Sequence, residues 1–306
     1  TPMPSYSNLA GVLGKPKEDE NKLTWALVHY VKSLEVKKYD RISNPIENNK
    51  IISSKTNNVI DPEEFIYGST SLWDNAEIYS IPVSRLWQSE SANYQTINVR
   101  SMYNSKYIAI KMDWEDQTID ERLYRVQDFQ DAAAIQFSID GVKGFHGMGS
   151  EDHPTDIWFW KAEWQLRTNK KTESDIALAY ANRVSDSDIE TYPKVMNDMA
   201  YLSGRDAGNI NSTANKTSPV ENVMSKGPQT VMSFPNSKQK VAGNGIWNGK
   251  KWQVVFVRKL KSKSEQKVKF TKYKPIPIAF AIWNGVKEDR NGQKLVSTWY
   301  ELELKN

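Results

Sequence analysis

The chain has 306 residues, of which 39% are apolar and 25% are charged, a composition typical of a globular protein with a sizeable core. No stretch approaches the roughly 18 apolar residues of a membrane helix, so no membrane span is expected. The net charge of +4 is spread over runs of mixed sign, which disfavours a nucleic-acid partner. The absence of cysteine excludes disulfides, thiolate nucleophiles, cysteine-bound iron–sulfur clusters and a c-type haem attached to these residues.

The first residues predict a short helical segment. Asp19 and Asn21 are candidate helix caps, and an apolar stripe follows between Leu23 and Leu34. Polar residues rich in Asn, Lys and Ser come next, and we assign residues 37–62 to a linker.

From residue 63 onward the pattern becomes that of short strands. Alternation of apolar and polar residues, or short apolar runs, predicts strands at residues 77–83, 95–102, 107–114, 132–139, 155–167, 252–260, 266–271, 276–283 and 298–304. A long polar stretch at about 168–235, with one helix expected at 173–183, interrupts the series as an insertion that could bind a partner. We therefore predict a mainly β protein, with an antiparallel β-sandwich over residues 63–306.

The sequence contains no recognisable catalytic constellation. No Gly-rich phosphate loop precedes a helix, and no Ser-His-Asp elbow stands out. Paired carboxylates such as Glu115 and Asp116 fall in turn-like sequence, where solvated charges are the ordinary interpretation. We therefore expect a chain without chemistry of its own.

The most unusual segment covers residues 141–164. Gly147 and Gly149 flank Met148 in a loop, and glycines there would let the backbone approach a ligand closely. Trp158, Trp160 and Trp164 follow at strand spacing, enough flat apolar surface to pack a large planar ligand. Thioether sulfur is a soft metal ligand, although the residues alone favour an ordinary loop methionine. A turn near the C-terminus carries further polar candidates, Lys287, Arg290 and Lys294, for which solvent exposure is the ordinary interpretation.

Several motifs, in order, resemble the haem b subunit of the molybdenum enzymes related to ethylbenzene dehydrogenase, a group that includes selenate and chlorate reductase, dimethyl sulfide dehydrogenase and nitrite oxidoreductase. The resemblance runs from about Gly68 to the C-terminus. It rests on the segments Trp73–Ala76, Met112–Thr118, Asp131–Phe137, the Met148 loop with His153–Pro154 and Ile157–Trp158, Ser218–Glu221, Gly243–Trp247, Trp252–Arg258, Ala279–Gly285, and Arg290 with Lys294.

This resemblance implies a haem b held between Met148 and Lys294. A neutral amine is needed to bind iron, so Lys294 is expected to be buried with a lowered pKa. The sequence departs from the family pattern at His146-Gly147, which makes His146 a rival ligand. The strand spacing of Trp158 and Trp160 makes them candidates to pack the porphyrin, and charge and location alone make Arg290 or Lys287 candidates to pair with its propionates.

The N-terminal segment carries a second resemblance. Met3-Pro4 followed by the helix with Trp25 and His29 resembles the end of a class I cytochrome c domain over residues 1–36. The resemblance implies that Met3 binds a haem c if the attachment motif lies upstream of these residues; the alternative is a domain that has lost its haem.

Together these resemblances imply a non-catalytic electron-transfer subunit. It would relay electrons between the iron–sulfur subunit of a molybdopterin oxidoreductase and a soluble cytochrome, in the periplasm or an equivalent lumen. The competing interpretation is a carbohydrate-binding β-sandwich module, which would present exposed tryptophans and hold no haem; a purely structural subunit is a third.

Overall fold

The structure is a computed structural model that describes residues 49–57, 60, 70–85, 94–123, 127–170, 216–272 and 274–305. The chain divides into two units, residues 1–45 and 46–306, and the described residues all belong to the second. The predicted helix in the first unit, the haem c segment with Met3, and the helix expected at 173–183 lie outside the described residues.

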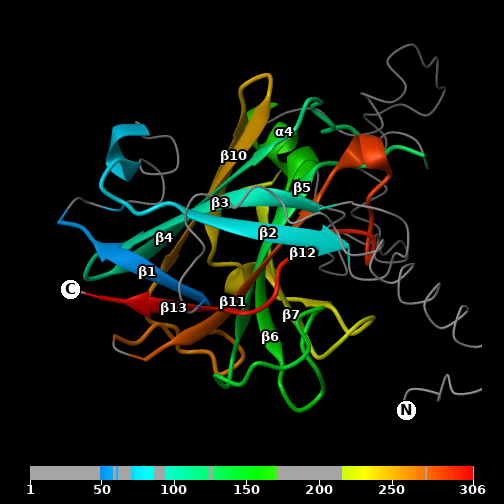
Figure 1. Cartoon of the computed structure of the whole chain (residues 1–306). Helices are drawn as coiled ribbons and strands as arrows, with labels where there is room; N and C mark the ends of the chain where they lie inside the picture. The colour runs from blue at the N-terminus through cyan, green and yellow to red at the C-terminus, as the bar shows by residue number, and fades with distance from the viewer. Residues whose placement is uncertain are drawn as a thin grey trace, which may run out of the picture. The chain divides into compact units, whose positions relative to one another are not determined.

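The described residues form a mainly β fold, as predicted (Figure 1). The strands are β1 (Lys50–Lys55), β2 (Tyr79–Arg85), β3 (Tyr94–Tyr103), β4 (Tyr107–Glu115), β5 (Ala132–Ser138), β6 (Thr155–Lys161), β7 (Val220–Ser225), β8 (Met232–Ser233), β9 (Ala242–Trp247), β10 (Lys251–Lys259), β11 (Ile276–Trp283), β12 (Leu295–Val296) and β13 (Tyr300–Leu304). The helical elements are α4 (Ala162–Lys170) and the 3-10 turns η3 (Thr70–Trp73), η5 (Asn236–Lys238) and η6 (Gly285–Lys287).

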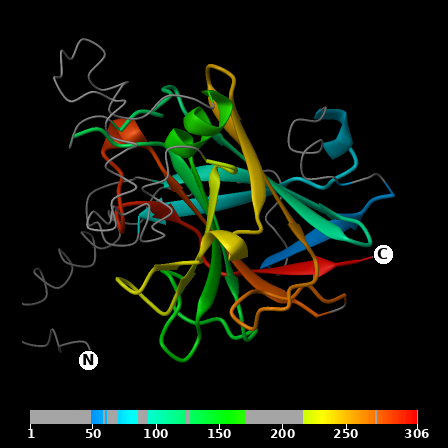
Figure 2. The ribbon, with the colours of Figure 1, turned by 180° about the vertical axis from the view of Figure 1, so that it is seen from behind.

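One continuous hydrogen-bonded sheet builds the sandwich. Its order is β8-β7-β6-β5-β11-β12-β2-β3-β4-β10-β9, and β1 and β13 branch from it. The sheet bends at β12, so that β5, β6 and β11 form one layer and β2, β3, β4 and β10 form the other (Figures 1 and 2). The neighbouring strands are antiparallel, except that β1 pairs in parallel with both β13 and β3.

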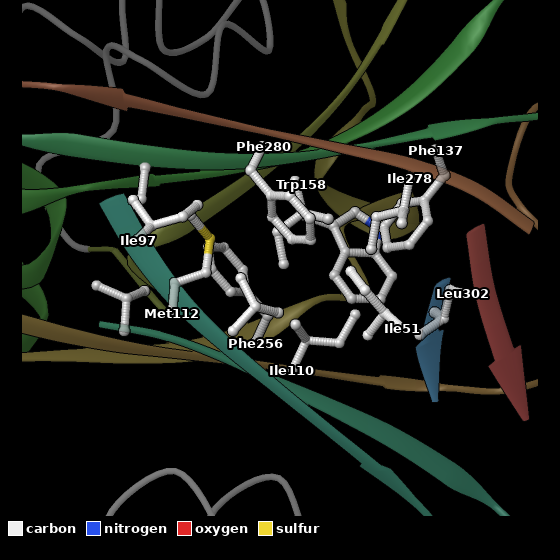
Figure 3. Close-up of a cluster of buried hydrophobic side chains, with 14 of the residues drawn as sticks. Ile51, Ile97, Ile110, Met112, Phe137, Trp158, Phe256, Ile278, Phe280 and Leu302 are labelled. Carbon is white, nitrogen blue, oxygen red and sulfur yellow. The ribbon is translucent and has the colours of Figure 1, made fainter. Parts of the chain in front are cut away.

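The core lies between these two layers. Figure 3 shows Phe137, Trp158 and Ile278 from one layer packed against Ile110 and Phe256 from the other. The rings of Trp158 and Phe256 meet across the sandwich with their centroids 6.5 Å apart. Because alternate residues of a strand point to opposite faces, the positions between these core residues face outward from the sandwich.

Three sequence expectations need correction. Residues 50–55, expected in a linker, form β1 and bury Ile51 in the core. The long strand expected at 155–167 ends at Lys161, and α4 continues from Ala162. Residues 266–271, expected as a strand, have no regular secondary structure.

The insertion expected at about 168–235 contains two strands of the sheet near its C-terminal end. Residues 220–225 and 232–233 form β7 and β8, which extend the sheet beside β6. Residues 171–215 lie outside the described part of the chain.

Candidate functional site

A cavity of about 610 Å³ lies on the outer face of the β5–β6–β11 layer. Its wall is made by the outward-facing residues of these strands and their neighbours, among them Gln136, Phe159, Val223, Trp283 and Val296. Three loops complete it, at residues 146–148, 228–231 and 291–294. A volume in this range suits a medium-sized organic ligand.

Small side chains make the floor of the cavity flat. Ala134 on β5 and Ala279 and Ala281 on β11 all line it. They alternate with the large core residues Ile135 and Phe280, which point to the other face of the same strands. A sheet that carries large residues inward and alanines outward leaves a shallow apolar surface on which a planar molecule can lie.

Met148 lies at the edge of this surface, in a tightly held loop. Its backbone φ is +104°, a conformation that residues other than glycine rarely adopt and that costs about 1–3 kcal/mol. The carbonyl of Met148 accepts a hydrogen bond from Gly227 N at 3.0 Å, and Gly149 N donates to Phe145 O at 2.8 Å. These bonds fix the loop, and the half-buried Met148 side chain lines the cavity.

Gly149 is required for the shape of this loop. Its φ is +77°, and a Cβ there would lie 2.7 Å from His153 O and 2.9 Å from Thr155 Cγ2. The sequence interpretation, in which these glycines let the backbone approach a ligand, stays a prediction; at Gly149 the close contact is with Thr155 at the start of β6 and with His153 in the loop before it.

Lys294 reaches the same cavity from the turn before β12. The residue is only 7% exposed, and it forms no ion pair with a carboxylate among the described residues. Its Nζ lies 4.9 Å from the centre of the Trp283 ring. Burial lowers the pKa of Lys294 from 10.5 to about 8, so a neutral amine is accessible near physiological pH.

His146 also lines the cavity, half-buried two residues before Met148. Its carbonyl accepts a hydrogen bond from Gln136 Nε2 at 3.3 Å, which ties the loop to β5. The structure thus brings Met148, Lys294 and the rival His146 to one cavity.

Arg290 and Lys287 are placed differently. Both are exposed, and neither lines the cavity. The Arg290 guanidinium stacks 4.8 Å from the centre of the Phe129 ring and donates to Glu288 O. Within the described residues the polar groups at the cavity rim are instead Gln229 and Asn291.

The expectation that Trp158 and Trp160 line the ligand site is corrected by their placement. Both are fully buried in the core, where Trp160 also contacts Trp252 at 4.9 Å between ring centres (Figure 3 shows Trp158). The intervening residues of β6, Ile157 and Phe159, line the cavity. Trp164, expected on the same strand face, lies on α4 instead.

The sequence analysis did not identify Phe159 and Trp283, whose rings lie in contact and form part of the cavity wall. Their ring centres are 4.9 Å apart, and each lies at an outward position of its strand. No signal in the sequence alone could have found them, because the cue lies in the strand pairing: Phe159 pairs with Ala134, and Trp283 pairs with Ala132.

The donor set suits a transition metal carried by a planar ligand. A thioether and an unpaired, desolvated amine are both neutral donors that such a metal accepts, and they border one apolar floor. No cluster of three or more His, Asp or Glu in the described residues could hold a free metal ion. The residues present therefore fit a bound organic metal complex better than a bare ion. Among the same residues no helix is long and apolar enough to cross a membrane.

Comparisons with known proteins match this chain to one family. The family model described as ethylbenzene dehydrogenase matches residues 70–295. A Haloferax mediterranei protein, provisionally named a respiratory nitrate reductase haem subunit, is 22% identical over 76% of this chain and 66% of its own length. Chlorate reductase subunit gamma from Ideonella dechloratans is 22% identical, over 70% of this chain and 67% of its own. Dimethylsulfide dehydrogenase subunit gamma from Rhodovulum sulfidophilum is 26% identical, over 66% and 58%. The chain thus spans about two thirds or less of these relatives.

A solved structure from Bacteroides uniformis, provisionally described as a carbohydrate-binding protein, also aligns. Its TM-score is 0.47 at 9% identity, over 84% of this chain and 99% of that one. A likeness at this level carries no inference about function.

Proposed function

Because the chain belongs to the ethylbenzene dehydrogenase family, we propose that it is a haem-binding electron-transfer subunit rather than a catalytic one. The observation that carries the proposal is that Met148 and Lys294, far apart in sequence, line one alanine-floored cavity. The names of the relatives, which include a haem subunit and two gamma subunits of reductase-type complexes, support it.

In this proposal the cavity would hold haem b, and Met148 and Lys294 are the residues that would bind its iron. The haem would supply one-electron exchange between ferrous and ferric iron. The rigid Met148 loop would hold the thioether in place, and the buried Lys294 would offer its amine without a carboxylate to compete for it. Phe159, Trp283 and the alanine floor would exclude water and keep the surroundings of the iron apolar, which favours a raised potential.

The partners belong to the same proposal. They are the iron–sulfur subunit of a molybdopterin oxidoreductase on one side and a soluble cytochrome on the other, in the periplasm or an equivalent lumen. A haem c held by Met3 and a segment upstream would provide a second relay site. A carbohydrate-binding module receives less support, because every tryptophan in the described residues is buried or half-buried.

An absorption spectrum of the purified chain tests the proposal. We expect a Soret band and a b-type pyridine haemochrome, and a colourless protein that fails to take up added haem would refute it. Met148→Ala and Lys294→Ala should each abolish the low-spin spectrum. If His146→Ala does so and Met148→Ala does not, the ligand assignment is wrong.

Two matched variants serve as controls for these substitutions. Met232→Ala removes a methionine that is 53% exposed on β8, and Lys287→Ala removes an exposed lysine from the turn before Lys294. Both should leave the low-spin spectrum unchanged, because neither residue lines the cavity.

A further inference from the structure

A second cavity, distinct from the proposed haem site, forms an open groove of about 950 Å³. It lies between residues 237–242 and the end of β10 with the segment that follows it. Five exposed lysines line it: Lys238, Lys240, Lys259, Lys261 and Lys263. We call this surface the lysine groove.

The charge of the lysine groove is one-sided. Arg258 and Lys267 also line it, so within the described part of the chain every charged lining residue is a cation and none is Asp or Glu. Serine and threonine hydroxyls, such as those of Ser237 and Ser262, supply further hydrogen-bond donors. Clustered cations repel one another, and an anion placed between them relieves that repulsion.

The floor of the groove contains Lys267, a buried cation that forms no ion pair with an Asp or Glu among the described residues. Lys267 is 4% exposed, and its Nζ donates to two neutral oxygens, Asn222 Oδ1 and Lys238 O, at 2.5 Å each. Burial lowers the pKa of Lys267 to about 8, against the attraction of Asp156.

The nearest acid is already committed to another cation. Asp156 is completely buried and binds Arg258 Nη1 at 2.9 Å, Asn222 Nδ2 at 2.6 Å and Val268 N at 3.0 Å. The positive charge at the groove is therefore not neutralised from within the described fold.

The lysines after β10 are spaced at every second residue. From Lys259 to Ser264 exposure alternates, with Lys259, Lys261 and Lys263 exposed and the residues between them half-buried. The backbone bends at Leu260 and Lys263, so this spacing sets no fixed interval between the lysine side chains. Several cations on one rim favour a partner that carries several carboxylates along its chain. By contrast, no Gly-rich loop, the usual cradle for a phosphate, borders the groove.

We propose that the lysine groove docks an acidic segment of a partner protein that carries several Asp or Glu residues. Carboxylates of the segment would pair with the exposed lysines at the rim, and one would approach Lys267 on the floor. Such electrostatic complementarity chiefly sets the association rate and the orientation of the partner.

The position of the groove links it to the haem site, and this link alone rests on the proposed function. Asp156 on β6 and Asn222 on β7 belong to the groove network, and the next residues, Ile157 and Val223, line the cavity on the opposite face. The groove network and the cavity therefore use opposite faces of the same two strands.

The test is binding of a labelled peptide of alternating Glu and Ser to the purified full chain, followed by fluorescence anisotropy. We expect binding at about 20 mM salt that is lost at about 500 mM salt. Reversing two charges, in Lys261→Glu/Lys263→Glu, should weaken it about tenfold or more. The matched variant Lys250→Glu/Lys251→Glu, at the other end of β10, should change it less than about twofold.

Two results would overturn the proposal: equal weakening by both double variants, or tighter binding of inorganic triphosphate than of the peptide. Thermal unfolding of each variant checks that the fold is intact. A Soret spectrum of the same sample distinguishes failure of the groove proposal from failure of the haem proposal. Peptide binding by a colourless protein supports the groove alone, and a normal Soret band without peptide binding supports the haem site alone.

Discussion

Replacing Lys294 by Met should stabilise the haem-free chain at neutral pH while replacing the amine donor of the proposed haem site by a thioether. Lys294 is 7% exposed and its pKa falls from 10.5 to about 8 because of burial alone. At about 1.4 kcal/mol per pH unit, keeping this lysine charged in the fold costs about 3 kcal/mol. Methionine has a similar length and no charge, so it avoids this cost.

The effect should depend on pH in a defined direction. Between pH 8 and 10.5 the unfolded chain holds the lysine proton and the folded chain does not, so the free energy of unfolding rises with pH over this window. The cost of the charged lysine is present in full below pH 8 and disappears near pH 10.5. The difference between the wild type and Lys294→Met should therefore be largest at pH 7 and vanish toward pH 10.5.

Urea unfolding followed by tryptophan fluorescence at both pH values measures this difference. We expect Lys294→Met to be more stable by about 2–3 kcal/mol at pH 7. Lys287→Met, at an exposed position of η6, should change stability by less than about 0.5 kcal/mol. If Lys294→Met is less stable than the wild type at pH 7, the inference that the fold retains this lysine at a cost in stability is refuted.

Three further predictions concern the walls of the same site. Ala281→Phe should fill the cavity and prevent haem uptake. The free energy of unfolding should change by less than about 1.5 kcal/mol, because Ala281 faces out of the sandwich. Normal uptake on haem titration would argue against the cavity as the site. Gly149→Ala should lower the free energy of unfolding by about 1–3 kcal/mol, because the new Cβ would clash with His153 O. It should also disturb the band of the visible spectrum that reports ligation by Met148. Chemical unfolding measures the first effect and the visible spectrum the second. Trp158→Leu should cost about 2–4 kcal/mol in the same unfolding assay but leave the Soret maximum in place, and a shifted maximum would contradict the placement of Trp158 in the core.

Which residues share a strand face was predictable, but which face meets the ligand was not. The spacing of Trp158 and Trp160 correctly puts them on one side of β6. The period of two says nothing about whether that side faces the other layer or the cavity, because both are apolar. The alanines on the neighbouring strands settle it, and strand neighbours are not visible in a single sequence.

The site residues depended on family resemblance more than on local pattern. Met148 and Lys294 lie in loops where a methionine or a lysine is ordinary, and only the folded sheet brings them to one cavity. β1 was missed because its parallel partners, β13 and β3, lie far along the chain. The start of α4 had a local signal, the Glu163–Arg167 pair at spacing four, which the strand interpretation passed over.

The short strand β12 has a consequence for how quickly a ligand can be exchanged. Only two residue pairs join β12 to β11, and two join it to β2, whereas nine join β10 to β4. Segments with so few pairs open locally at a much lower free-energy cost than the whole domain. Since Lys294 directly precedes β12, local opening would release the lysine and uncover the cavity while the sandwich stays folded. The residence time of a bound haem would then report the opening rate of this short segment rather than the rate of global unfolding.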